Sequence, residues 1–124
     1  MNEDDPLTHR IIGCAMQVHS ALGPGLLESA YEVCLEHELK KAGFTVERQV
    51  YVPVVYDGVQ LDSGYRIDLL VNGEVILELK VVERVLPVHE AQLLSYLRLA
   101  NKRRGLLINF HTASLKDGII RRSL

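Results

Sequence analysis

The chain has no tryptophan and only two cysteines among its 124 residues. Cys14 and Cys34 lie in stretches whose apolar residues recur at helical spacing, and no cluster of histidine and cysteine accompanies them. The sequence therefore has neither a zinc-binding motif nor the paired cysteines of a small secreted domain. We interpret both residues as buried thiols of a protein in a reducing cytoplasm.

Long hydrophobic runs are also missing, and there is little excess charge of either sign. No apolar run approaches the length of a membrane span, and the first five residues, Met-Asn-Glu-Asp-Asp, are acidic where a secretory signal would be basic. A soluble cytoplasmic protein with no membrane contact is the expectation. The formal net charge of −2 disfavours broad electrostatic capture of nucleic acid, so a polyanion would have to be bound locally.

The residues that are present suffice for one globular domain. Hydrophobic residues make up 48% and charged residues 24% of the chain, and no repeat or linker divides it, so residues 1–124 are predicted to form a single α/β or α+β domain. A first helix should begin at Asp5-Pro6, as an N-cap followed by proline, and end at Gly23-Pro24-Gly25. A second should span about 26–42 and stop at Gly43.

The period of the apolar residues then changes to two. Three or four strands are expected between Thr45 and Val82, with turns at glycine-containing pairs such as Asn72-Gly73 and an edge strand or interruption at Pro53. A third helix after Pro87, a short buried strand at 104–110 and a last strand at 118–122 complete the chain. The predicted order up to the buried strand is ααββββαβ.

One predicted hairpin places chemically useful side chains together. In the segment 65–80, Asp68, Leu70, Ile76, Glu78 and Lys80 share one alternation, whereas the other, from Ile67 to Leu79, is entirely apolar. Keeping the two sets on opposite faces requires Asp68 to lie opposite Glu78, because a one-residue slip would mix charge into the buried face. The turn at Asn72-Gly73 must then be an odd loop or contain a bulge, and Gly73 suits the left-handed position of a three-residue loop.

Two carboxylates and an ammonium on one face suit the hydrolysis of phosphodiesters. Magnesium commonly takes one or two protein carboxylates, which Asp68 and Glu78 could supply, and keeps positions for water and a phosphate oxygen. Lys80 would lie where an ammonium can orient hydroxide or stabilise charge on the phosphorane. The alternative is a solvent-facing ladder of ion pairs among Glu78, Lys80 and Arg66.

The segment Gly25-Leu-Leu-Glu28-Ser-Ala-Tyr31 opens the second predicted helix. Glu28 lies beside the apolar stripe of this helix, from which its carboxylate could point toward the hairpin as a further metal ligand. It could equally serve only to complement the helix dipole, since an acid in the first helical turn does so. Tyr31 is better interpreted as a core residue whose hydroxyl is hydrogen-bonded than as a catalyst.

The third predicted helix carries a polar line, because His89, Gln92 and Tyr96 recur at i, i+3 and i+7. Gln92 could hydrogen-bond a metal-bound water or a phosphate, and Tyr96 could contact the substrate backbone, although hydrogen bonding in the interior would explain both. His89 could be a base or ligand, but a lone histidine at a helix start is more often structural.

From Ile11 to Ile120 the sequence resembles the GxxExxY family of the PD-(D/E)XK nuclease superfamily. Gly25, Glu28 and Tyr31 match the family motif, and Asp68, Glu78 and Lys80 match the superfamily core, with Ile67 where many members have proline. Gln92 and Tyr96 match the Q-x-x-x-Y element of RecB-like exonucleases. The resemblance implies a restriction-endonuclease-like mixed sheet flanked by helices, with Glu28, Asp68 and Glu78 as metal-facing acids and Lys80 as the catalytic lysine.

These observations predict a Mg²⁺- or Mn²⁺-dependent nuclease acting on nucleic acid, most readily DNA, with Gln92 in the catalytic set. Tyr96 and the basic residues Arg103 and Arg104 are expected to contact the substrate, although the basic run 102–104 and Arg121-Arg122 are equally consistent with solvated ends of elements. A homodimer or a protein partner would compensate for the small positive charge. The alternative function is a non-catalytic nucleic-acid-binding or structural subunit of a DNA-processing or defence assembly.

Overall fold

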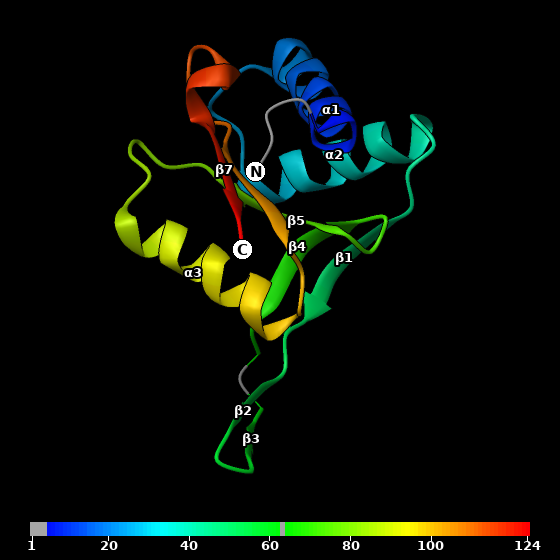
Figure 1. Cartoon of the computed structure of the whole chain (residues 1–124). Helices are drawn as coiled ribbons and strands as arrows, with labels where there is room; N and C mark the ends of the chain where they lie inside the picture. Colours follow the sequence, from blue (N-terminus) through cyan, green and yellow to red (C-terminus); the bar gives the residue numbers. More distant parts are fainter. Residues whose placement is uncertain (1–4, 63) are drawn as a thin grey trace.

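The computed structural model describes residues 5–62 and 64–124 and contains a mixed five-stranded sheet between helices (Figure 1). The first four residues of the acidic N-terminus, and the interpretation given to them, lie outside the described residues. Along the chain the elements are α1 (Pro6–Leu22), α2 (Glu28–Lys41), β1 (Val46–Tyr51), β2 (Val54–Tyr56), β3 (Val59–Leu61), β4 (Arg66–Val71), β5 (Val75–Lys80), α3 (Pro87–Leu99), β6 (Arg104–Asn109), the 3₁₀ helix η1 (Leu115–Gly118) and β7 (Ile119–Ser123).

The sheet has the strand order β1-β4-β5-β6-β7. Its strands pair antiparallel except β5 and β6, which are parallel and are joined through α3, as a parallel pair requires a crossover. The predicted fold class, a mixed α/β arrangement consistent with the restriction-endonuclease-like fold, is confirmed. The prediction that residues 1–124 form one domain stays a prediction.

The two predicted N-terminal helices form where their caps indicated. Asp5 is the N-cap of α1: its Oδ1 accepts a hydrogen bond from the backbone N–H of Leu7 at 3.1 Å, and Pro6 is the first helical residue. Gly23 and Gly43, which end the two helices, have φ of 69° and 96°. None of the described helices is long and apolar enough to cross a membrane.

The stretch between α2 and α3 contains five strands, one more than the largest number predicted. Pro53 interrupts the chain after β1, and β2 and β3 then form a separate two-stranded sheet that projects away from the body of the molecule (Figure 1). The expectation that Pro53 marks an edge strand or an interruption is confirmed on both counts, because β1 is also an edge of the main sheet.

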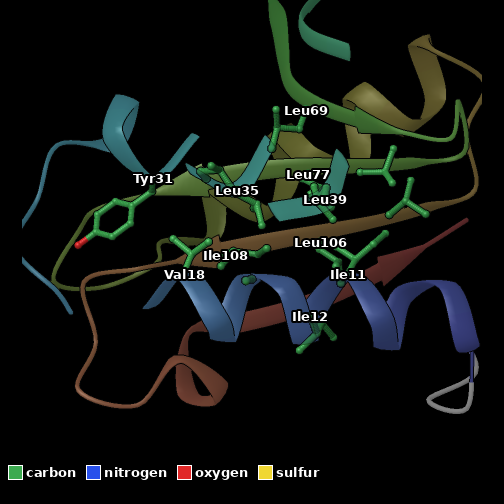
Figure 2. Packing of buried hydrophobic residues seen from close by; sticks show 14 of the residues in the cluster. Ile11, Ile12, Val18, Tyr31, Leu35, Leu39, Leu69, Leu77, Leu106 and Ile108 are labelled. Atoms are coloured by element: carbon green, nitrogen blue, oxygen red, sulfur yellow. The ribbon is translucent and has the colours of Figure 1, made fainter. Parts of the chain in front are cut away.

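Each face of the sheet is covered by its own set of helices. Residues Leu69, Val71, Val75, Leu77 and Leu79 pack against α1 and α2, and Figure 2 shows part of this cluster, with Ile11 and Val18 of α1 and Leu35 and Leu39 of α2 lying over Leu77, Leu106 and Ile108. Cys14 and Cys34 are free thiols that pack partly buried at its margin, where full burial was expected. Leu70 and Ile76 pack on the other face against α3.

Ile67 departs from the predicted alternation. It was assigned to the entirely apolar set, yet it packs with Leu70, Ile76 and Tyr96 on the α3 side. The alternation therefore holds from Leu69 onward and breaks at Asp68, where β4 and β5 no longer pair through a regular ladder.

The helix α3 approaches β6 closely because Gly105 has no side chain; a Cβ there would lie 2.7 Å from Leu93 Cδ1.

Candidate active site

Asp68 and Glu78 link β4 to β5 through side-chain hydrogen bonds at the end of the hairpin away from its turn. The backbone N–H of Asp68 donates to Glu78 Oε2 at 2.9 Å, and the backbone N–H of Leu79 donates to Asp68 Oδ2 at 2.8 Å. Two carboxylates thus take the place of the ladder bonds that would follow the last regular pair, Leu69 with Leu77. The register of the hairpin, extended by one residue, puts Asp68 across from Glu78 as predicted; that both side chains share one face of the sheet stays a prediction.

The turn of the hairpin sets this register. Val71 pairs with Val75, which leaves a three-residue loop in which Asn72 and Gly73 have φ of 54° and 65°. Asparagine tolerates the left-handed region better than other residues with a side chain. Asn72 is also fixed from outside, since its Oδ1 accepts a hydrogen bond from the backbone N–H of Thr45 at 3.0 Å and its N–H donates to the carbonyl of Thr45 at 2.8 Å.

Glu28 reaches the carboxylate pair from the first residue of α2, and Tyr31 fixes the loop that precedes it. The Tyr31 hydroxyl donates to the carbonyl of Gly23 and accepts from the N–H of Leu26 at 3.2 Å. Its ring is fully buried and stacks on Phe110 at 4.4 Å between centroids, so Tyr31 is a core residue, as predicted. Tyr31 therefore holds the loop that leads into Glu28, the first residue of α2.

Burial and mutual repulsion define the electrostatics of the site. Glu78 is only 4% exposed; burial, and then the neighbouring Asp68, raise the pKa of Glu78 to about 8 against the opposing effects of the Asp68 N–H and Lys80. Burial also raises the pKa of Asp68, and partial burial followed by the Asp68 carboxylate raises the pKa of Glu28. The positive charge of Lys80 opposes the rise in pKa of all three acids, so Lys80 is electrostatically coupled to the whole acidic group.

The alternative of a solvent-facing ladder of ion pairs does not describe this geometry. Glu78 is buried, whereas the guanidinium of the exposed Arg66 lies 4.9 Å from the ring centroid of Tyr51. Lys80 is the cation that faces the carboxylates, from two residues further along the same strand.

Two further residues belong to the site and were not predicted. Gln49 Nε2 donates to Glu32 Oε1 at 2.6 Å and lies 3.4 Å from Asp68 Oδ1, so one amide joins a buried glutamate of α2 to the site. Glu32 is 7% exposed and also faces Arg48 at 3.6 Å. The sequence contains one signal for Glu32, its position four residues after Glu28 within the apolar stripe of the helix.

Gln49 adopts an uncommon backbone conformation, with φ of 54° in the middle of β1, opposite Asp68. A residue with a side chain is strained there, and such strain often persists at functional sites. No pattern in the sequence indicated it.

The predicted polar line on α3 divides into a structural and a site-facing part. The backbone N–H of Leu86 donates to His89 Nδ1 at 2.9 Å, so His89 caps the helix, which is its structural interpretation. Tyr96 is 5% exposed, and burial followed by the Glu78 and Asp68 carboxylates raises its pKa to about 12, which keeps its hydroxyl protonated. Gln92 and Tyr96 line a groove of about 400 Å³ between α3 and the residues Val54 and Tyr65.

The basic residues predicted to contact substrate lie elsewhere. Arg104 pairs with Val75 at the turn end of the hairpin, three residues along β6 from Leu107, the partner of Glu78, which corresponds to about 10 Å. Its guanidinium contacts Asp5 and Glu74. Arg103 and Arg104 are thus not brought together with the carboxylates, and Arg122 pairs with Glu90 of α3. Substrate contact by Arg103 and Arg104 stays a prediction.

The donor set suits a hard cation with few protein ligands. No group of three or more His, Cys, Asp and Glu side chains within residues 5–62 and 64–124 is arranged to hold a metal ion. Mg²⁺, however, commonly keeps several waters and takes one or two carboxylates. Asp68 and Glu78 each have a second oxygen beyond the one that binds a backbone N–H, and a cation beside them would relieve the repulsion that raises the pKa of Glu78.

The arrangement as a whole is that of a nuclease-like α/β domain whose acidic pair and lysine lie at the end of a central hairpin. The sequence matches the PD-(D/E)XK nuclease superfamily over residues 5–122. The chain belongs to this superfamily. Searches of curated proteins and of solved structures found no significant match.

The raised pKa of Glu78 makes the stability of the metal-free protein dependent on pH. Because the folded pKa of about 8 exceeds the ordinary glutamate value of 4.5, the folded state retains this proton, and the stabilisation is lost as pH rises from about 5 to about 8. We expect the free energy of unfolding, measured by urea denaturation in a chelator, to fall by a few kcal/mol over this range. Glu78→Gln should remove most of the slope, whereas Glu74→Gln, at the exposed turn of the same hairpin, should retain it.

The backbone of Gln49 predicts an inverted order of glycine and alanine. At an ordinary strand position glycine is less stable than alanine by roughly 0.5–1 kcal/mol. At position 49, with φ of 54°, Gln49→Gly should instead be more stable than Gln49→Ala by about 1 kcal/mol. The same pair of substitutions at exposed Glu47 on β1 provides the control. If the alanine variant were the more stable at both positions, backbone strain at Gln49 would be contradicted.

Proposed function

We propose that this protein is a Mg²⁺- or Mn²⁺-dependent nuclease of the GxxExxY type that hydrolyses phosphodiester bonds in DNA. The observation that carries the proposal is a pair of hydrogen bonds across the hairpin, from the Asp68 N–H to the Glu78 carboxyl and from the Leu79 N–H to the Asp68 carboxylate, with the charge of Lys80 close to both acids. Membership of the nuclease superfamily supports nucleic acid as the substrate. The motif Gly25, Glu28, Tyr31 supports the finer family, because these residues order the approach of α2 to the site.

Asp68 and Glu78 would hold the metal ion, and Glu28 would join them directly or through water. When bound, the ion supplies Lewis-acid polarisation of the phosphate and lowers the pKa of a bound water. Lys80 keeps an ammonium beside the reacting phosphate, where it stabilises the negative charge that develops on the phosphorane oxygens. The neutral Tyr96 hydroxyl and the Gln92 amide, both in the adjoining groove, are donors that can position the DNA strand.

Binding of DNA would depend on local contacts, because the formal net charge of the chain is −2. Arg103 and Arg104 are retained as contacts for a strand that extends along the sheet beyond the site. The free thiols of Cys14 and Cys34 support residence in a reducing cytoplasm.

The proposal predicts metal-dependent cleavage that requires the acidic pair and the lysine. Single-stranded, nicked, branched and duplex DNA should be incubated with Mg²⁺ or Mn²⁺, and at least one should be cut by the wild type. Glu78→Gln, Asp68→Asn and Lys80→Ala should each lower the rate by about 100-fold or more, since each removes a group that acts on the transition state. Glu38→Gln and Lys41→Ala, at an ion pair of partly buried Glu38 with exposed Lys41 near the far end of α2, are matched controls that should keep full activity.

Metal linkage separates a metal-binding subunit from an enzyme. Mn²⁺ should raise the melting temperature of wild type and of Lys80→Ala but not of Asp68→Asn, because a ligand that binds the native state stabilises it. Cleavage of none of the DNAs despite this shift would leave the non-catalytic subunit as the function. Equal cleavage by wild type and Glu78→Gln would reject the site itself.

A further inference from the structure

The sheet of β2 and β3 forms an arm that extends away from α1 and α2 at the opposite end of the molecule (Figure 1). Each of its strands pairs with only one neighbour among the described residues, so both outer edges are open. A two-stranded hairpin of this kind is at best marginally stable by itself in water. A partner that packs on the arm would therefore stabilise it.

One face of the arm is apolar. The register pairs Val54 with Leu61 and Tyr56 with Val59, which places these four side chains on one face, while Val55 and Gln60 share the other. Tyr56 is 78%, Val59 58% and Leu61 46% exposed. Large apolar side chains gathered on one exposed face are typical of an interaction site.

The charges on the arm disfavour nucleic acid as its partner. Residues 52–65 contain Asp57 and Asp62 but no lysine or arginine, whereas binding to a phosphate backbone depends on basic side chains. The open edges also lack the lysines that commonly block edge-to-edge pairing of strands. An apolar protein surface is the partner that this chemistry fits.

We propose that the partner is a second copy of this chain, with the two arms packed antiparallel about a two-fold axis. The arm is complementary to itself in this direction: its tip carries the exposed Asp57, its base carries the exposed Arg66, and the apolar face lies between them. Tyr51, which pairs with Arg66, lies six residues before Asp57, at most about 20 Å of extended chain, so full overlap can bring each Asp57 beside Arg66 of the partner copy. A two-fold interface uses the same patch on both copies, as this one does.

The size of the arm sets the strength of the contact. The apolar face offers only four side chains per copy, so the contact lies at the lower end of the size range for specific interfaces and the dimer should be reversible. The dimer does not depend on the proposed nuclease activity.

The mass of the full chain in solution tests the proposal. Sedimentation equilibrium from about 1 to 500 µM should show a monomer–dimer equilibrium for wild type, and Val59→Ser should weaken it at least about 10-fold. Val55→Ser is the matched control, because the same substitution on the other face of the arm should leave the equilibrium nearly unchanged. Circular dichroism should show that both variants remain folded, since both side chains are exposed.

Charge exchange tests the antiparallel arrangement and the identity of the partner. Asp57→Lys and Arg66→Glu should each weaken the dimer, and the double variant should restore it, because each new charge then meets its opposite on the second copy. The backbone strain of lysine at position 57, where φ is 49°, is present in both Asp57→Lys and the double variant, so it does not affect the comparison of these two.

Any of three results would overturn the proposal. The wild type could be monomeric at every concentration, Val55→Ser and Val59→Ser could weaken the dimer equally, or the double variant could fail to restore it. Weaker DNA binding by Val59→Ser in a chain that is always monomeric would overturn it in favour of a nucleic-acid contact.

Discussion

The contact on which the site depends is the exchange of hydrogen bonds between the Asp68 and Glu78 segments across the β4–β5 hairpin. Each strand donates a backbone N–H to the carboxylate of the other, at 2.9 and 2.8 Å. A charge-assisted bond of this kind holds the strands together while opening the ladder between them. It also anchors both side-chain carboxyl groups to backbone N–H groups, so their separation does not depend on side-chain rotamers alone.

This geometry has an electrostatic cost that the surrounding elements reduce. Two buried acids side by side disfavour ionisation, which is why the pKa of Glu78 is raised to about 8. Lys80 opposes this effect, and Gln49 and the Leu79 N–H stabilise the Asp68 carboxylate. A divalent cation bound there, as proposed, would reduce this cost further.

The sequence predicted the central hairpin well because a single constraint determines it. Alternation from Leu69 to Leu79 demanded a register that kept an apolar face buried, and Asn72-Gly73 supplied the left-handed residues that this register needs. Ile67 was assigned to the wrong face because alternation assumes a regular strand, and the strand is irregular at Asp68. The arm was only partly foreseen, since Pro53 indicated an interruption but not the direction that the chain takes after it.

The residues Glu32 and Gln49 were missed because neither belongs to a local pattern. The Gln49 amide meets Glu32 and Asp68 only when β1 pairs with β4 and α2 packs beside them, contacts between residues 17 and 19 positions apart. In the same way, the ion pairs of Arg104 with Asp5 and Glu74 depend on the packing of distant segments.

By itself the sequence determined most of the elements and the register of the central hairpin, because these follow from local periodicity and turn chemistry. Only the tertiary structure decided the burial of Glu78, the shift in its pKa and the shell around Asp68. The physical reason is that desolvation and hydrogen bonding across elements exist only once the helices cover both faces of the sheet.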